Sequence, residues 1–243
     1  MVKILCLIPA RSGSKGIKDK NIKDFGGYPL MGWTIMQAVK SKHAVNMRIV
    51  VSTDSKKYAI IANAYGAETP FRRPDEISQD LSTDYEFINH AVNWLSVNED
   101  YVPDFIVQLR PTQPHRRIED IDKCIDLFLQ HYQNYDSLRS VVLFEKSPYK
   151  MYTVEGHDTK NRTNLRLKPI FKEINGIKEP YNQCRQTLPQ TYLHNGYIDI
   201  FKTTLLEGKT ISGENIYPFI MSKDNIIDID TETDWKKAEQ TCL

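Results

Sequence analysis

The distribution of apolar residues predicts alternating strands and helices over the first part of the chain. Ile4–Ile8 is a short unbroken apolar run, typical of a buried strand, and it ends at Pro9. Apolar residues then recur at helical spacing over Met31–Val39 and, after a β-branched strand at Met47–Ser52, over Tyr58–Tyr65. Such alternation favours a parallel sheet with helices on both faces and with ligand sites at the carboxyl ends of its strands.

The same pattern continues to residue 144 and changes after it. Thr83 followed by Glu86 forms a capping box, which predicts a helix that runs to about Asn98. Over residues 145–190 the periodicity weakens and the turn signals Gly156 and Gly176 appear, so we expect an insertion that contains hairpins. The other expected elements are a long loop over Thr69–Thr83, strands at Phe105–Leu109, Ser140–Phe144, Leu193–Phe201 and Tyr217–Met221, and helices around Ile121–Phe128 and after Thr231.

These segments together predict a doubly wound, mostly parallel α/β fold of the Rossmann-like type. We expect residues 1–144 and 191–243 to form the main domain, and residues 145–190 to form a small insertion within it. A chain of 243 residues is long enough to bury the core that such a domain needs.

Composition narrows the classes of function. Lys and Arg number 32 against 31 Asp and Glu, a formal net charge of +1, which argues against a general nucleic-acid or membrane surface. The four cysteines form no C-x-x-C pair, and Cys6 and Cys124 fall in apolar segments, which is typical of a reducing compartment. The sequence has no long apolar run and no lipidation signal, so we expect a cytoplasmic protein.

The loop after the first strand carries the main candidate chemistry. Residues 9–21, PARSGSKGIKDKN, combine two glycines with Arg11, Lys15 and Lys20. Glycines let the backbone turn several N–H groups into one concavity, where cations neutralise a bound anion, so we predict a nucleotide triphosphate as the ligand. The loop matches neither G-x-x-x-x-G-K-[ST] nor G-x-G-x-x-G. Its composition alone leaves a solvated basic turn as the alternative.

Two further stretches add residue types that bind anions and metals. Residues 110–116, RPTQPHR, follow a predicted strand, and we interpret them as a rigid lip that faces an anion. Asp228 and Asp230 project to the same side of an extended backbone, just before a final helix that Thr231 and Asp234 would cap. Carboxylate oxygens of this kind suit Mg²⁺, or Mn²⁺, together with phosphate oxygens and water. The alternative is that both aspartates solvate a turn or favour the helix N-terminus.

Four separated motifs together resemble those of the acylneuraminate cytidylyltransferases, also called CMP-sialic acid synthetases. The motifs are IPARSGSKG with Lys20-Asn21, the RPTQPHR lip, RQTLPQ and NG within residues 185–196, and DIDTETD over residues 228–234. The resemblance runs from the first predicted strand to the last helix. It implies a nucleotidyltransferase fold, dimerisation through residues 145–190, and a homodimer in which each partner helps to close the other's site.

The resemblance also implies a reaction and the residues that perform it. CTP and a 2-keto-3-deoxy sugar acid, an N-acylneuraminate or a related nonulosonic acid, would give a CMP-sugar and pyrophosphate for a bacterial-type surface glycan. The implied residues are Lys20, Arg11, Asp228 and Asp230 for catalysis, Arg11, Ser12, Gly13, Ser14, Lys15, Gly16, Asn21 and Arg73 for the nucleotide, Arg110, Thr112, Lys150, Arg185, Asn195 and Asp199 for the sugar acid, and Asp228 and Asp230 for the metal.

Two positions depart from the sialic-acid-activating members, which typically have Gln in place of Arg110 and Tyr in place of Asp199. A coupled exchange to one cation and one anion puts sialic acid itself in question as the substrate. The alternative substrate is another sugar acid such as an octulosonate, and the alternative from another class is a nucleotide-binding regulator without turnover. The alternation in residues 197–200, YIDI, also permits Asp199 to lie on the solvent side of a strand.

Overall fold

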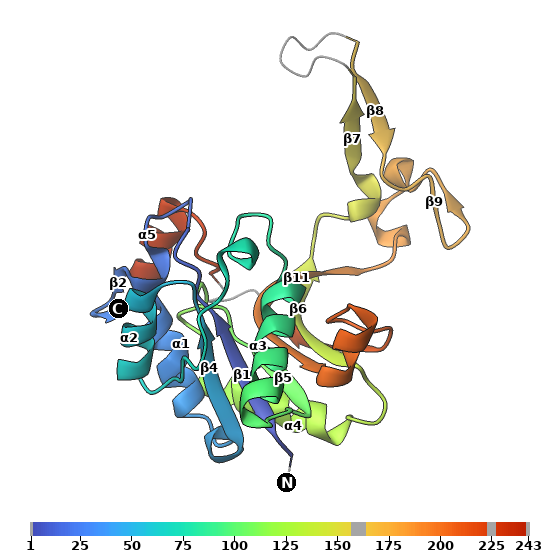
Figure 1. The fold of residues 1–243 in the computed structure, drawn as a ribbon. Helices are drawn as coiled ribbons and strands as arrows, with labels where there is room; N and C mark the ends of the chain where they lie inside the picture. The colour runs from blue at the N-terminus through green and yellow to red at the C-terminus, as the bar shows by residue number, and fades with distance from the viewer. Residues whose placement is uncertain (1, 157–163, 223–226, 242–243) are drawn as a thin grey trace. The chain divides into compact units, whose positions relative to one another are not determined.

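The computed structural model of the chain describes residues 2–156, 164–222 and 227–241. The chain divides into two compact units (Figure 1). The first unit comprises residues 1–140, 195–219 and 223–243, and the second comprises residues 141–194 and 220–222.

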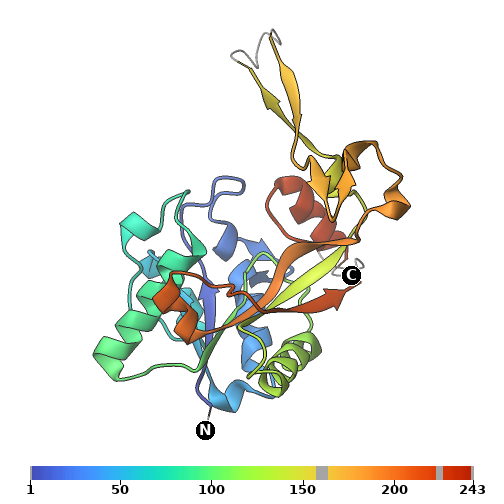
Figure 2. The same ribbon diagram turned by 90° about the vertical axis from the view of Figure 1, so that its right-hand side faces the viewer.

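A six-stranded sheet runs through the first unit, in the order β12-β6-β11-β5-β1-β4 (Figures 1 and 2). Strand β1 lies in its interior and pairs in parallel with β4 on one side and with β5 on the other. Strand β11 pairs with β5 in the antiparallel direction. Because β1 pairs in parallel with both of its neighbours, the mostly parallel α/β fold expected from the sequence is confirmed. The strands are β1 Ile4–Pro9, β4 Met47–Ser52, β5 Phe105–Gln108, β6 Ser137–Phe144, β11 Thr191–Lys202 and β12 Ile216–Met221.

Helices cover both faces of this sheet. Figure 2 shows α3 on one side of β1, with α1 and α4 on the other. The predicted capping boxes are both present, with Thr83 and Glu86 at the start of α3 and Thr231 and Asp234 at the start of α5. Because each box satisfies backbone N–H groups that a helix leaves unpaired, it fixes the residue at which the helix begins. The helices are α1 Leu30–Val39, α2 Lys56–Ala64, α3 Asp84–Glu99, α4 Ile118–Gln130 and α5 Glu232–Gln240.

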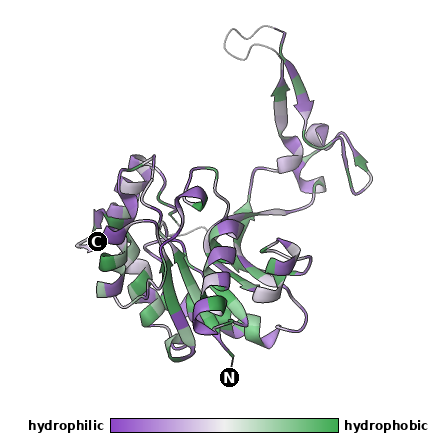
Figure 3. Cartoon of the chain, viewed as in Figure 1, coloured by the Kyte–Doolittle hydropathy of each residue, from purple (hydrophilic) through white to green (hydrophobic). Residues whose placement is uncertain are grey.

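The apolar side chains of the strands form the core between these layers. Figure 3 shows the hydrophobic colour concentrated on the central strands. Leu5 and Leu7 of β1 pack with Ala91 and Leu95 of α3, all four fully buried. A second cluster joins the two ends of the chain, because Ile17, Phe25 and Leu30 pack against Ile229, Trp235 and Ala238. This cluster brings the loop after β1 and the segment before α5 together.

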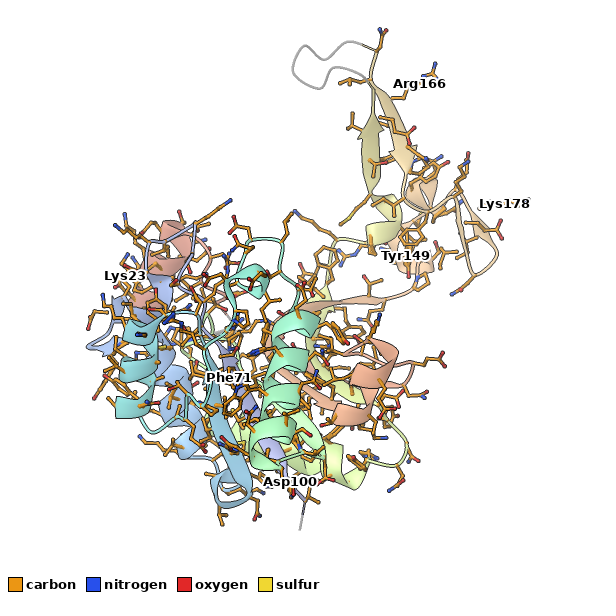
Figure 4. All side chains as sticks on the ribbon, viewed as in Figure 1. Lys23, Phe71, Asp100, Tyr149, Arg166 and Lys178 are labelled. Carbon is orange, nitrogen blue, oxygen red and sulfur yellow. The ribbon has the colours of Figure 1, made fainter. Side chains whose placement is uncertain are left out.

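The second unit has little core of its own. It contains two hairpins, in the stretch where hairpins were expected, and Figure 4 shows side chains that project from both, with Arg166 and Lys178 labelled. Every residue of β7 is exposed, including Val154 at 52%. The hairpin strands are β7 Tyr152–Glu155 with β8 Arg166–Pro169, and β9 Glu173–Ile174 with β10 Ile177–Lys178.

Cys6 and Cys124 are buried and Cys184 is exposed, and all three are free thiols, while Cys242 lies outside the described residues. Among the helices of the described ranges, none is both long enough and apolar enough to span a membrane.

Candidate active site

A pocket of about 470 Å³ lies in the first unit, where β1 and β5 end. The loop after β1, the residues that follow β5, the first turn of α3 and the segment before α5 all contribute to its wall. Ten of the residues expected from the sequence line this pocket, namely Arg11, Ser14, Lys15, Gly16, Lys20, Asn21, Arg73, Arg110, Thr112 and Asp230. The sequence-predicted loop therefore does face a cavity.

Gly16 is required by close packing rather than by an unusual backbone angle. Neither Gly13 nor Gly16 is among the residues with positive φ, contrary to the expectation that glycine flexibility shapes the loop. A Cβ atom on Gly16 would instead overlap the backbone carbonyl oxygen of Asp230. A residue larger than glycine would therefore push the loop away from the segment before α5.

Asp54, which follows the carboxyl end of β4, holds the start of the glycine loop. Its two carboxylate oxygens accept hydrogen bonds from the Ser12 backbone N–H, at 2.8 Å, and from the Ser12 hydroxyl, at 2.5 Å. The Ser14 N–H donates to the Ser12 carbonyl oxygen at 3.1 Å. Ser12 thus binds Asp54 and does not line the pocket. The backbone N–H groups of Ser12 and Ser14 already have hydrogen-bond acceptors within the protein.

Asn21 and Arg73 are held firmly at the pocket wall. Asn21 is 5% exposed, and its side-chain amide donates to the Arg11 carbonyl oxygen at 3.0 Å. Arg73 is 4% exposed and donates to the hydroxyl and the carbonyl oxygen of Ser52, at 3.0 and 2.7 Å. Burial lowers the pKa of Arg73 to about 10, and within the described part of the chain no carboxylate forms an ion pair with it. A buried cation without a paired anion favours binding of an anionic ligand.

Lys20 connects the glycine loop to the segment before α5. Its ammonium group donates to the Ile229 carbonyl oxygen at 2.7 Å and to Asp230 Oδ1 at 2.9 Å. The Lys20 side chain is 13% exposed, whereas that of Asp230 is 70% exposed. The lysine is therefore fixed at the pocket while the carboxylate beside it remains open to solvent.

Asp228 lies close to the same group of charges. Desolvation of its carboxyl group raises its pKa above the ordinary value, a hydrogen bond with Thr112 opposes the rise, and the negative charge of Asp230 adds to it. The negative charges of the two carboxylates therefore repel one another. Asp230 lines the pocket, whereas Asp228 does not.

The two aspartates have the donor chemistry that a divalent cation needs. Across residues 2–156, 164–222 and 227–241, no three His, Cys, Asp or Glu side chains gather into a set that could hold a metal ion by themselves. Mg²⁺ commonly takes only one or two protein carboxylates and completes its shell with phosphate oxygens and water. The mutual repulsion of Asp228 and Asp230 would also be relieved by a cation between them, so the residues fit a metal that arrives with a polyphosphate.

Arg110 belongs to a network of four charged side chains. Its guanidinium donates to Asp199 Oδ2 at 2.5 Å and to Asp84 Oδ2 at 2.6 Å, and Arg139 lies 3.0 Å from Asp199 Oδ2. Burial lowers the pKa of Arg110, but the charges of Asp199 and Asp84 outweigh this effect and hold the pKa above its ordinary value. The positive charge of Arg110 is therefore balanced by two carboxylates of the protein, those of Asp199 and Asp84.

Asp199 is fully buried, so its placement on the solvent side of a strand is wrong. The antiparallel register of β11 and β5 sets Asp199 opposite Gln108. Arg110 follows two residues later and is a diagonal neighbour of Asp199, within reach of a long side chain. Arg110 and Asp199, the two residues that differ from the sialic-acid-activating pattern, thus form an ion pair with each other.

Arg116 corrects the expectation that both arginines of the lip face an anion. It is 3% exposed, and burial lowers its pKa to about 10. Its guanidinium donates to the Tyr197 carbonyl oxygen at 2.7 Å and to the Arg110 carbonyl oxygen at 2.8 Å. Arg116 thus ties the lip to β11 from within the core, and of these two arginines only Arg110 lines the pocket.

The other sequence-predicted residues lie outside the pocket wall. Gly13 is exposed, and Asn195 Oδ1 accepts hydrogen bonds from the Ser140 hydroxyl at 2.7 Å and from the Tyr197 N–H at 3.1 Å. Lys150 and Arg185 belong to the second unit. There, the Lys150 ammonium donates to the Gln183 carbonyl oxygen at 2.5 Å, and Arg185 lines a separate cavity of about 340 Å³.

Three acidic residues that contact the predicted loop and lip residues were not predicted from the sequence. These are Asp54 on Ser12, Asp80 on Arg11 and Lys15, and Asp84 on Arg110. The sequence offered a signal for two of them, because Asp54 comes two residues after a parallel strand ends and Asp84 opens the helix that the Thr83 capping box predicts. Asp80 gave none, since nothing in a loop sequence indicates which distant cation a carboxylate meets.

Comparison with known proteins gives consistent matches over the full length of the chain. The cytidylyltransferase family model matches residues 5–239. The chain is 34% identical to post-translational flagellin modification protein B of Campylobacter coli, over 98% of this chain and 94% of that protein. It is 32% identical to the CMP-N,N'-diacetyllegionaminic acid synthase of Legionella pneumophila, over 98% of this chain and 96% of that protein.

Two further similarities extend these matches. The chain is 31% identical over 97% of its length to the N-acylneuraminate cytidylyltransferase of Escherichia coli O18:K1:H7, of which it spans about half, 51%. Among solved structures, CMP:2-keto-3-deoxy-manno-octonic acid synthetase complexed with CTP superposes with a TM-score of 0.66 at 15% identity, covering 99% of this chain and 98% of the other. At 15% identity, the structural similarity shows a shared fold and nothing about function.

Proposed function

This chain belongs to the cytidylyltransferase family, and we propose that it couples CTP to a 2-keto-3-deoxy sugar acid to give a CMP-sugar and pyrophosphate. The observation that carries this proposal is the pocket in which Arg11, Lys15, Lys20 and Arg73 converge beside Asp230. A triphosphate needs several cations, and phosphoryl transfer also needs a metal-binding carboxylate.

A nonulosonic acid is the substrate class that the comparisons favour. The relatives that are at least 30% identical to this chain include proteins named for N-acylneuraminate and for N,N'-diacetyllegionaminic acid. The protein named for an octulosonate resembles this chain at only 15% identity. We therefore propose a nonulosonic acid as the substrate and keep an octulosonate as the alternative.

The proposed reaction is a single displacement at phosphorus. The anomeric oxygen of the sugar acid forms a bond to the α-phosphorus of CTP, the bond from that phosphorus to the bridging oxygen breaks, and the hydroxyl proton is released. Pyrophosphate leaves with the bond electrons. Because little covalent chemistry falls to the protein, positioning and charge stabilisation supply most of the catalysis.

Seven residues at the pocket or near it have a role in this proposal. Arg11 and Lys15 hold the triphosphate, while Asn21 and Arg73 place the nucleotide. Lys20, fixed by Ile229 and Asp230, meets the charge that grows on the phosphate oxygens. Asp228 and Asp230 would hold Mg²⁺ or Mn²⁺, which when bound neutralises phosphate charge.

The direct test is pyrophosphate release from CTP with a panel of sugar acids, followed by mass analysis of the nucleotide product. We expect a CMP-sugar with at least one nonulosonic acid. A CMP-sugar formed only with an octulosonate would select the alternative substrate. Binding of CTP without turnover on any acid would support a nucleotide-binding regulator instead.

Replacing Lys20 with Ala is expected to lower kcat about 100-fold with a much smaller change in KM for CTP. The reason is that the charge that Lys20 meets is larger in the transition state than in bound CTP. Steady-state kinetics with CTP varied and the sugar acid saturating gives both constants. Lys18→Ala is the matched control, because Lys18 is an exposed lysine of the same loop that does not line the pocket. A raised KM with unchanged kcat would reduce Lys20 to a binding residue.

We also propose that the protein is a homodimer that forms through residues 145–190, and that Lys150 and Arg185 bind the sugar acid. The motif resemblance supports this proposal, as does the exposure of Val154 and Leu167 on a hairpin with little core of its own. A cytoplasmic location is proposed from the free thiols.

Light scattering at micromolar concentration is expected to give twice the mass of the 28.2 kDa chain. Excision of residues 145–190 with a short linker should yield a monomer that has lost activity, because the excision removes both Lys150 and Arg185. Circular dichroism and thermal unfolding would establish that the remaining sheet is folded. An active monomer, from the full chain or from the excised variant, would contradict the proposed assembly.

A further inference from the structure

A single carboxylate of the protein already pairs with two cations of the glycine loop, Arg11 and Lys15. Asp80 Oδ1 lies 3.0 Å from Arg11 Nη2, and Asp80 Oδ2 contacts the ammonium of Lys15. Hydrogen bonds from Lys15 and Arg11 hold the pKa of Asp80 below its ordinary value, so it is an anion at neutral pH. Asp80, Arg11 and Lys15 all line the pocket.

Asp80 stands on a turn that is stabilised from within. The Gln79 N–H donates to the Ser82 hydroxyl at 2.9 Å, and the Gln79 side-chain amide donates to the Asp75 carbonyl oxygen at 2.7 Å. The next residue, Leu81, is 93% exposed and does not anchor the turn in the core. The turn therefore keeps its own shape whether or not Asp80 contacts the glycine loop.

We propose that Asp80 sets the affinity for the triphosphate by occupying, in the free protein, the place between Arg11 and Lys15 that a phosphate group takes. This inference rests on the proposed function, because it assigns a competitor to the same anion site. Carboxylate and phosphate oxygens are alternative partners for the same N–H donors. The nucleotide must consequently displace Asp80 before it can bind both cations. The free energy of each broken ion pair then weakens the binding of the nucleotide.

The same exchange runs backwards when pyrophosphate leaves. A tethered carboxylate competes with the product for Arg11 and Lys15 and so favours its release. A protein that bound the product without this competitor would be more strongly inhibited by it. Asp80 thus weakens the binding of CTP and speeds the release of pyrophosphate.

The direction of one mutational effect separates this proposal from a purely supportive role. If Asp80 competes with phosphate, Asp80→Asn tightens anion binding, because the amide carries no charge. If Asp80 instead orients Arg11 and Lys15 for the ligand, the same change weakens anion binding. Asp75→Asn is the matched control, since Asp75 is an exposed acid of the same segment that does not line the pocket.

The experiment is calorimetric titration of the 243-residue chain with CTP, inorganic tripolyphosphate and cytidine at one fixed ionic strength. For Asp80→Asn and Asp80→Ser we expect the Kd of CTP and of tripolyphosphate to fall roughly 3- to 30-fold, the range that two exposed ion pairs can account for. Cytidine, which carries no phosphate, should bind as it does to the wild type. Asp75→Asn should leave all three constants unchanged, and inhibition by pyrophosphate should strengthen in the Asp80 variants.

The outcomes distinguish this inference from the proposed function. Unchanged or weaker binding of both anions by the Asp80 variants overturns the inference, whatever the activity of the wild type. If the wild type makes no CMP-sugar while the variants still bind tripolyphosphate more tightly, the proposed function fails and the role of Asp80 stands. An equal gain with Asp75→Asn would overturn it by showing a general charge effect.

Discussion

Replacing Asp228 or Asp230 with Ala is expected to lower the rate of CMP-sugar formation roughly 1,000-fold or more while the fold is retained. Loss of metal neutralisation costs several kcal/mol in the transition state, and each 1.36 kcal/mol is a factor of about ten in rate. Both aspartates are exposed, so their truncation leaves no cavity in the core. Of the substitutions considered, we expect these to have the largest effect on turnover.

The measurement is kcat with Mg²⁺ or Mn²⁺ titrated against a chelator, with circular dichroism as the check on folding. Wild-type activity should vanish with the chelator and return with either metal. Glu232→Gln is the matched control, because Glu232 is a nearby acid whose surface ion pair with Lys23 is worth little. A variant that is fully active in the presence of the chelator would contradict the metal assignment. Titration of Mn²⁺ into the CTP complex provides a second readout, independent of turnover.

Replacing Asp199 with Asn is expected to lower the free energy of unfolding by about 3–5 kcal/mol, because it leaves two partly buried arginines without their shared carboxylate. Arg110→Gln should cost less, since Asp199 keeps Arg139 as a partner. Denaturant unfolding measures both changes. Asp126→Asn is the matched control, because Asp126 also lies between two basic groups, Lys42 and His43, but on the surface. Its replacement should cost less than about 1 kcal/mol.

The same network supports an expectation about substrate preference. Arg110→Gln and Asp199→Tyr are each expected to reduce kcat/KM for the native sugar acid, and the double variant should shift preference toward N-acetylneuraminic acid. A double-mutant cycle with CTP saturating and two sugar acids varied measures the coupling. Strictly additive effects with an unchanged preferred sugar would show that the two residues act independently and that specificity lies elsewhere.

Much of the fold could be predicted because local patterns determine it. The run Ile4–Ile8 became β1, and the capping residues Thr83 and Thr231 correctly marked the starts of α3 and α5. These signals work over a few residues, where backbone hydrogen bonding and burial of one face decide the structure.

The partners of the charged side chains could not be predicted in the same way. Asp80 meets Arg11 across 69 positions in the sequence, and Arg110 meets Asp199 across 89. Such pairs depend on strand order and register, which a local pattern does not contain. Arg116 shows the same limit, because the arginine that the sequence placed on the lip is used inside the core to hold that lip in place.

The contact of the glycine loop with the segment before α5 has a consequence for biosynthesis. Lys20 finds its backbone partner at Ile229, 209 positions later, and Gly16 packs against Asp230. At ordinary translation speeds, roughly 10 to 40 s separate the synthesis of these two parts. During that interval Ile17, Phe25 and Leu30 lack the apolar partners that later cover them. The nascent chain therefore exposes an apolar surface that a chaperone can shield, and the proposed active site assembles only after the segment before α5 has been made.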